Sequence, residues 1–216
     1  MSRALSNINM NTKSNLSNIR QRFGRILRES ASLILLLVGL LAFRSSLADH
    51  YYVPSGSMEP TLIPGDRVVV DKMSYGLRVP FTQIQFTNGD AVQRGEVVIF
   101  DSPRDGARLI KRIVAVEGDR VVVKNGRLTI NGRHMAAAEQ LDVEIFGDRI
   151  VSLDLSDCGG PDYFGEIPQG KLLAVGDHRG NSLDGRIFGV IDETSVYGRA
   201  IAVYFRSDDG FVWKKL

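Results

Sequence analysis

The stretch DRVVVKNGRLTING, residues 119–132, decides the fold class. Two β-branched runs flank Asn125-Gly126, and Asn-Gly between such runs is a strong signal for a β-hairpin. Asp209-Gly210 near the C-terminus is a second hairpin signal. Similar short runs bounded by Gly, Asp, Asn and Pro lie at 66–72, 95–101, 108–119, 170–177 and 198–205. The sequence therefore predicts an all-β body made mainly of antiparallel sheet.

The stretch from about 119 to 170 is less regular than the rest. It contains MAAAEQ at 135–140 and a loop rich in Gly, Asp and Pro at 156–162. Strand-like runs resume on either side of it, so we expect a smaller β-rich lobe inserted into the main sheet. The main β-domain is then formed by residues 49–118 and 171–216.

An apolar segment, ASLILLLVGLLAF at 31–43, precedes the β-body and reaches Ala48 if Arg44 and two serines are included. Eighteen helical residues cover about 27 Å, close to the ~30 Å hydrocarbon thickness of a bilayer. Residues 31–48 are therefore predicted to form a transmembrane helix, with Arg44 near its outer end. Residues 1–30 carry six basic side chains against Glu29, which predicts a cytoplasmic leader and an extracytoplasmic β-body.

Two other interpretations of this segment stay open. It could be a buried core helix, or a cleavable secretory signal with a small-residue site at 46–48. The charged leader of about 30 residues is long for a secretory signal. A retained anchor is therefore favoured.

Composition excludes several classes of function. The chain has 216 residues and 44% hydrophobic content, enough for one good core. Beyond residue 30 it has 21 basic and 24 acidic side chains, so it lacks the basic surface of a nucleic-acid-binding protein. Cys158 stands alone and no His or Lys lies near it in the sequence, so neither a disulfide nor a cysteine nucleophile is expected.

Histidine chemistry has little support. The three histidines, His50, His134 and His178, do not have the spacing of a zinc motif, and no metal or cofactor is predicted. The G-x-S-x-G elbow of serine hydrolases is absent. His178 beside Asp177 is the only material for a Ser-His-Asp triad.

A lysine offers a different base. In RLIKRIVAV, residues 108–116, strand alternation puts Lys111 between Leu109 and Ile113 on one face. Burial would lower the lysine pKa, by up to about 3 to 5 units in fully buried cases, and leave a general base. The competing interpretation is that Lys111 and Arg112 protect an edge strand against aggregation.

Three motifs then occur in order. They are VPSGSMEPTLIPGD at 53–66, LIKRIVAVEGD at 109–119 and GDHRGNSLDGRIFG at 176–189. In isolation, two serines beside Gly56 could be an ordinary turn. Together with the N-terminal apolar segment, the motifs resemble the type I signal peptidase family over essentially the whole chain.

The resemblance implies a role for each motif residue. It makes Ser57 the nucleophile and Lys111 the general base, a pair that needs no histidine. It places Ser55 in the oxyanion hole beside the Ser57 backbone N–H and has Ser182 orient the lysine. The residues that match the last motif and support it are Asp177, Arg179, Asn181, Asp184 and Arg186. The residues that the resemblance assigns to narrow substrate pockets are Tyr51, Val53, Met58, Leu62 and Ile110.

The implied function is that of a membrane-anchored serine endopeptidase. It would remove signal peptides from secreted preproteins after a small-X-small site, acting as a monomer on the extracytoplasmic side of the bacterial inner membrane. Ser57 follows Ala48 by nine residues, which keeps the active site close to the bilayer surface. Pro54 and Pro60 would stiffen the loop, and Gly56 would let its backbone approach the substrate.

The sequence departs from the family pattern at three positions. His178, Gly180 and Gly185 stand where the last motif usually has Asn, Asp and Ser. These departures leave room for a specialised paralogue with a restricted substrate. A self-cleaving repressor protease shares the Ser/Lys pair, but the apolar segment at 31–43 contradicts it. A membrane-tethered β-domain that binds partners without catalysis is the alternative from another class.

Overall fold

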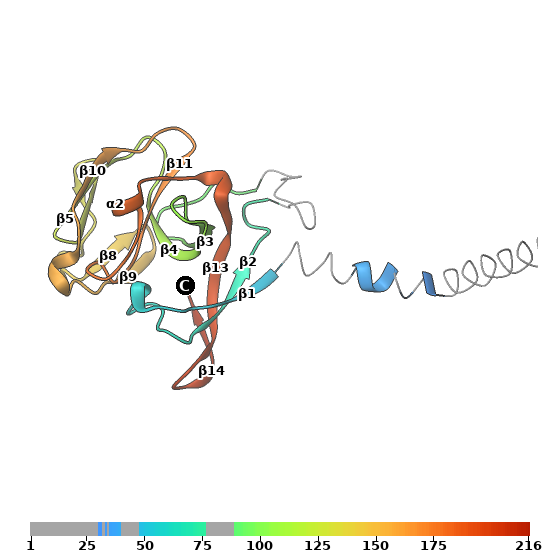
Figure 1. Cartoon of the computed structure of the whole chain (residues 1–216). Helices are drawn as coiled ribbons and strands as arrows, with labels where there is room; N and C mark the ends of the chain where they lie inside the picture. The colour runs from blue at the N-terminus through green and yellow to red at the C-terminus, as the bar shows by residue number, and fades with distance from the viewer. Residues whose placement is uncertain (1–29, 32, 34, 40–47, 77–88) are drawn as a thin grey trace, which may run out of the picture. The chain divides into compact units, whose positions relative to one another are not determined.

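A computed structural model describes residues 30, 31, 33, 35–39, 48–76 and 89–216. The chain divides into two compact units, Met1–Ser45 and Ser46–Leu216. In the first unit, the described residues between 30 and 39 are helical (Figure 1). No helix within the described ranges is long and apolar enough to cross a membrane. Much of the predicted span 31–48 lies outside those ranges, and its last residue, Ala48, is the first residue of a strand.

The second unit is built on an antiparallel sheet of eight strands (Figure 1). Its strand order is β1-β2-β13-β3-β4-β11-β12, and β14 pairs with β13 outside this path. The bounds are β1 Ala48–Tyr52, β2 Arg67–Asp71, β3 Val97–Asp101, β4 Arg108–Ala115, β11 Lys171–Val175, β12 Ile191–Asp192, β13 Val196–Arg206 and β14 Gly210–Lys215. The prediction of an all-β, mainly antiparallel body is confirmed.

Strands within the predicted lobe form two smaller sheets. One has the order β10-β5-β6-β7 and the other is the pair β8-β9. The bounds are β5 Arg120–Lys124, β6 Arg127–Ile130, β7 Arg133–His134, β8 Val143–Phe146, β9 Arg149–Ser152 and β10 Tyr163–Glu166. Lys124 pairs with Arg127 across a turn in which Asn125 and Gly126 have φ angles of 50° and 75°. Positive φ at both positions is what a type I′ turn requires, so the predicted hairpin is confirmed.

The described helices of this unit are short. They are α2 Gly185–Phe188 and the 3₁₀ turns η1 Gly56–Met58, η2 Asp157–Gly159 and η3 Glu193–Ser195. The second predicted hairpin also forms, with Arg206 of β13 opposite Gly210 of β14. Its loop is residues 207–209, so Asp209 belongs to the loop and Gly210 to the strand.

The large sheet and the lobe share a hydrophobic core. Val114 and Ala115 of β4 and Leu173 of β11 belong to the same buried cluster as Val123 of β5 and Phe146 of β8. Lobe residues are therefore packed directly on two strands of the main sheet. A displacement of the lobe would disturb those strands.

β4 occupies a central position in the sheet. It pairs with β3 on one side and with β11 on the other. Lys111 and Arg112 are each only 3% exposed. The interpretation of these two residues as guards of an edge strand is therefore wrong, because β4 has no free edge and neither side chain faces solvent.

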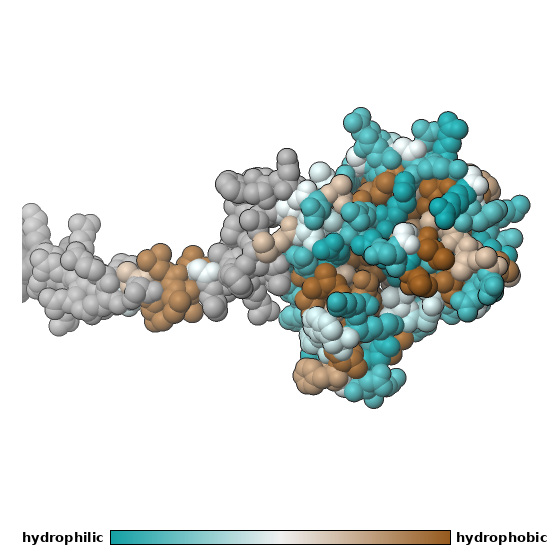
Figure 2. Space-filling view, turned by 180° about the vertical axis from the view of Figure 1, so that it is seen from behind, coloured by the Kyte–Doolittle hydropathy of each residue, from teal (hydrophilic) through white to brown (hydrophobic). Residues whose placement is uncertain are grey.

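The surface of the second unit is mixed. Figure 2 shows patches of apolar residues among hydrophilic ones on one face. The hairpin of β13 and β14 extends from the rest of the sheet (Figure 1), and its Phe211 and Trp213 are 87% and 64% exposed. Phe211 packs edge-on against Phe205, with ring centroids 5.7 Å apart. The aromatic contact lies beside the hairpin loop, while Val212 of β14 packs against the core.

Candidate active site

Ser57 lies in the 3₁₀ turn η1, which connects β1 to β2. The turn is closed by the Glu59 N–H, which donates to the Gly56 carbonyl at 3.0 Å, and by Leu62 N–H donating to Met58 at 2.9 Å. Met58 and Leu62 are fully buried and anchor the turn in the core, while Ser57 is 8% exposed. The nucleophile candidate is thus held by the packing of the residues that follow it.

Lys111 of β4 reaches this turn. Its Nζ lies 2.5 Å from Ser57 Oγ, a hydrogen bond between residues 54 apart in the sequence. Burial lowers the pKa of Lys111 from 10.5 to about 8, against the opposing effect of the Asp184 and Asp177 carboxylates. An amine with such a pKa is partly neutral near pH 7 and can accept the proton of a hydroxyl.

The two accessory serines are placed differently. Ser55 is exposed, and its Oγ lies 3.4 Å from Ser57 Oγ. Ser182 is 9% exposed, and its Oγ has no hydrogen-bond partner among the described residues. A Cβ added to Gly176 would overlap both Ser182 Oγ and the Ser57 carbonyl oxygen, so a glycine at 176 lets these two groups approach. The oxyanion and orienting roles stay predictions.

The acidic and basic residues of the last motif form buried ion pairs. Asp184 accepts from Arg186 Nη2 at 2.8 Å and from the Gly176 N–H at 2.9 Å. Arg179 donates to Glu144 Oε1 at 2.8 Å and is 1% exposed. These pairs fix the loop that follows β11. Asn181, the remaining matched residue, is exposed, and its backbone N–H donates to the His178 carbonyl at 3.1 Å.

Asp177 and His178 do not form a triad with Ser57. Both oxygens of Asp177 are taken by Arg112, at 2.8 and 2.6 Å, and one also accepts from Thr61. The His178 Nε2 lies 3.1 Å from Ser156 Oγ instead. The only histidine-based alternative for activating Ser57 therefore lacks its contacts.

Three residues that hold the last motif were not predicted from the sequence to belong to the site. Arg112 and Thr61 hold Asp177, and Glu144 holds Arg179. The position of Arg112 beside Lys111 was a signal that could have found it. Glu144 lies in the lobe, 35 residues before its partner, and no local pattern marks it.

The five predicted pocket residues come together in one place. Val53, Met58, Leu62 and Ile110 belong to one buried cluster, and Tyr51 packs against it. The Tyr51 hydroxyl donates to the Arg108 carbonyl at 2.9 Å, which links β1 to the start of β4. All four aliphatic members are 3% exposed or less. Their role in holding substrate stays a prediction.

Two of the three departures from the family pattern have a steric reason here. A Cβ at Gly180 would overlap the Ser156 carbonyl oxygen. A Cβ at Gly185 would lie 2.8 Å from Leu173 Cδ1 and 2.9 Å from the Ala174 carbonyl oxygen, closer than real Cβ contacts. In this chain the glycines permit close approach of neighbouring segments.

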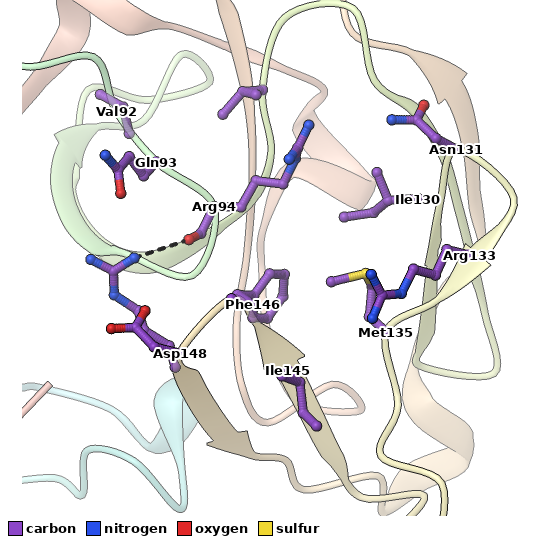
Figure 3. Close-up of a pocket in the computed structure, with 13 residues that line it drawn as sticks. Val92, Gln93, Arg94, Ile130, Asn131, Arg133, Met135, Ile145, Phe146 and Asp148 are labelled. Atoms are coloured by element: carbon purple, nitrogen blue, oxygen red, sulfur yellow. Dashed lines mark hydrogen bonds between the residues drawn. The ribbon is translucent and has the colours of Figure 1, made fainter.

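A hollow of about 780 Å³ lies away from these residues (Figure 3). It is bordered by the segment before β3, by β6 and by the β8-β9 hairpin, and no predicted site residue lines it. Arg149 Nη1 donates to the Arg94 carbonyl across its edge at 3.4 Å. Within the described ranges, no group of three or more His, Cys, Asp or Glu is placed to hold a metal ion, and Cys158 is exposed.

The family model and the curated relatives point to the same family. The family model described as "Signal peptidase, peptidase S26" matches residues 27–205. Signal peptidase I of Pseudomonas fluorescens is 32% identical over 193 residues, covering 76% of this chain and 67% of that protein. Signal peptidase I of Pseudomonas aeruginosa is 31% identical, covering 79% and 69%. A crystal structure of a signal peptidase I from Enterococcus faecalis covers 51% of this chain and 97% of that chain at 26% identity, with a TM-score of 0.37.

Proposed function

The chain belongs to the signal peptidase family, peptidase S26, and we propose that it removes signal peptides from exported preproteins with Ser57 as nucleophile and Lys111 as general base. The observation that carries the proposal is the 2.5 Å contact between Lys111 Nζ and Ser57 Oγ. The contact joins a hydroxyl to an amine whose pKa burial has lowered to about 8. These are the two requirements for a serine nucleophile that works without histidine.

The reaction follows from this pair. Neutral Lys111 takes the Ser57 proton as Oγ attacks the carbonyl carbon of the scissile bond. The lysine then gives that proton to the leaving amine, and the C–N bond breaks to leave an acyl-enzyme. Water, deprotonated by Lys111, attacks the ester, and the cleaved signal peptide leaves with a free carboxylate as Ser57 regains its proton.

Two serines would complete the site. Ser55 Oγ and the Ser57 N–H would donate to the oxyanion of each tetrahedral intermediate. One such donor contributes about 2.7 to 4 kcal/mol in a comparable protease site. Ser182 Oγ is buried and has no hydrogen-bond partner among the described residues, and we propose that it accepts from the Lys111 ammonium when the lysine is charged.

We also propose that the apolar segment beginning at Ala31 anchors the protein in the membrane, with the basic leader in the cytoplasm. Its helical side chains need an apolar surrounding: Leu35 and Leu36 are 71% and 66% exposed. Burying such side chains is favourable by about 25 cal/mol per Å². A retained anchor that ends before β1 begins at Ala48, and the lobe at 119–170, are parts of this proposal.

The test uses the full chain in detergent with a preprotein whose signal ends in a small-X-small triplet. Ser57→Ala and Lys111→Met should each abolish the mature product while the far-UV circular dichroism stays that of a β protein. Ser152→Ala and Lys124→Met are matched controls, because both side chains are exposed on lobe strands, and both should cleave normally. Normal processing by either dyad variant would reject the mechanism.

A further inference from the structure

His178 lies directly behind the nucleophile turn. Its backbone N–H donates to the Ser57 carbonyl at 3.3 Å. The residue is 9% exposed, and it stands where the family pattern has an asparagine. In the described residues the polar neighbours of its ring are Ser156, Asp154 and Glu59, and the mechanism does not explain why an imidazole is buried there.

The imidazole lies between two segments of the chain. On one side Nε2 is 3.1 Å from Ser156 Oγ and 3.6 Å from Asp154 Oδ2. On the other side Nδ1 is 3.7 Å from Glu59 Oε2 and has no hydrogen-bond partner within the described ranges. A movement of a few tenths of an ångström would bring Glu59 into hydrogen-bond distance of that nitrogen. The ring is therefore suited to bridge Glu59 and the 154–156 segment.

Glu59 belongs to the turn that carries Ser57. Its N–H donates to the Gly56 carbonyl at 3.0 Å, and its side chain folds back over Gly56. A Cβ at Gly56 would lie 2.9 Å from the Glu59 carboxyl carbon. The Glu59 carboxylate therefore lies close to Gly56, before Ser57, while the Glu59 backbone closes the turn after Ser57.

The 154–156 segment belongs to the lobe and is hydrogen-bonded to the 176–189 motif. Asp154 N–H donates to the Asp177 carbonyl at 3.0 Å, and the Arg179 N–H donates to the Asp154 carbonyl at 2.8 Å. Gly180 makes this approach possible, because a Cβ there would overlap the Ser156 carbonyl oxygen. The His178 and Gly180 departures therefore occur together: one residue makes room for the segment and the other contacts it.

We propose that His178 is a positioning residue, through which the lobe at 119–170 holds the nucleophile turn in register with Lys111. The proposal rests on the function proposed above. It assigns the lobe a part in catalysis, because the Ser156 and Asp154 side chains face the Glu59 side of the nucleophile turn through this ring, in addition to the backbone bonds that join Asp154 to Asp177 and His178 to Ser57. Proton transfer over 2.5 Å is sensitive to placement, and a misplacement of about 1 Å can cost about 100-fold in rate.

The experiment measures kcat and KM for preprotein cleavage by the full chain in detergent, normalised to the folded fraction from urea unfolding. His178→Leu should lower kcat by about 10- to 100-fold and leave KM within about twofold. His178→Asn keeps a polar group near the Nδ1 position, toward Glu59, but has no atom at the Nε2 position that faces Ser156, so it should recover only part of kcat. His134→Leu is the control, because His134 is exposed, and it should behave like the wild type.

A second pair of variants keeps the test decisive if His178→Leu does not fold. Glu59→Gln and Ser156→Ala change partly exposed groups on opposite sides of the ring. Each should lower kcat several-fold. The double variant should lower kcat by less than the product of the two single effects, because both changes interrupt the same connection through the His178 ring. Additive effects, or wild-type kcat in His178→Leu, would overturn the proposal. If one of these results were obtained while Ser57→Ala and Lys111→Met were inactive in the same assay, the positioning role of His178 would be rejected and the Ser57/Lys111 mechanism would stand.

Discussion

Replacing Lys111 by methionine should remove activity and yet stabilise the fold at neutral pH. Lys111 is 3% exposed, and burial lowers its pKa from 10.5 to about 8. At about 1.36 kcal/mol per pKa unit, keeping the lysine charged in the folded protein costs about 3 kcal/mol below pH 8. Methionine has a similar shape and no charge, whereas the lost hydrogen bond to Ser57 costs about 1 kcal/mol. The free energy of unfolding of Lys111→Met should exceed that of the wild type by about 2 kcal/mol at pH 7.

The stability advantage of Lys111→Met should decrease as the pH rises. Between about pH 8 and 10.5 the unfolded chain keeps the Lys111 proton while the folded protein has lost it. Stability of the wild type therefore rises with pH in this window because of Lys111, and Lys111→Met lacks that rise. The advantage of the variant should fall to near zero by about pH 10. Every other titrating group is common to both proteins, so the comparison isolates the lysine.

The assay is urea unfolding of the full chain at fixed detergent concentration, followed by circular dichroism at pH 7, 8, 9 and 10. Lys124→Met is the matched control, since Lys124 is exposed, and its difference from the wild type should not change with pH. A Lys111→Met protein that is less stable than the wild type at pH 7, or a difference that stays constant from pH 7 to 10, would refute the buried-lysine reasoning.

The other predictions concern activity, packing and processing. Cleavage should rise about tenfold per pH unit up to about pH 8 and then level off, because neutral Lys111 is the base; a flat profile in kcat/KM would contradict it. Ser182→Ala should slow turnover without abolishing it, as measured by kcat, and complete loss would assign this serine a larger role. Glu144→Ala leaves Arg179 buried without its carboxylate, so the free energy of unfolding in urea should fall by about 3 to 5 kcal/mol. A decrease below about 1 kcal/mol would argue against a buried ion pair. The protein should not process itself efficiently at 46–48, because Ala48 is already paired with Asp71 in a β-ladder. The intact mass of the purified protein should include the N-terminal leader. A main species that begins at Asp49 would contradict this prediction.

The sequence by itself determined the features that depend on local chemistry. Alternating β-branched runs and the Asn125-Gly126 turn gave the all-β class, because side-chain period and positive φ are properties of short segments. The three motifs carried the resemblance to the type I signal peptidase family, and that resemblance predicted Ser57 and Lys111 as nucleophile and general base. The sequence could not decide between a buried base and an edge-strand guard at Lys111, since alternation is the same for both.

Only the tertiary structure decided that question, because β4 becomes central through pairing with β11, whose first residue is 60 positions after Lys111. The same holds for the partners of the motif. Arg179 meets Glu144 and His178 meets Ser156 across loops that no periodicity links. A pKa near 8 likewise depends on the depth at which the chain buries an ammonium group and on the carboxylates of Asp184 and Asp177 that the fold brings near it. Long-range pairing sets solvent exposure and charge environment, and these are the quantities that turn a serine and a lysine into a candidate catalytic pair.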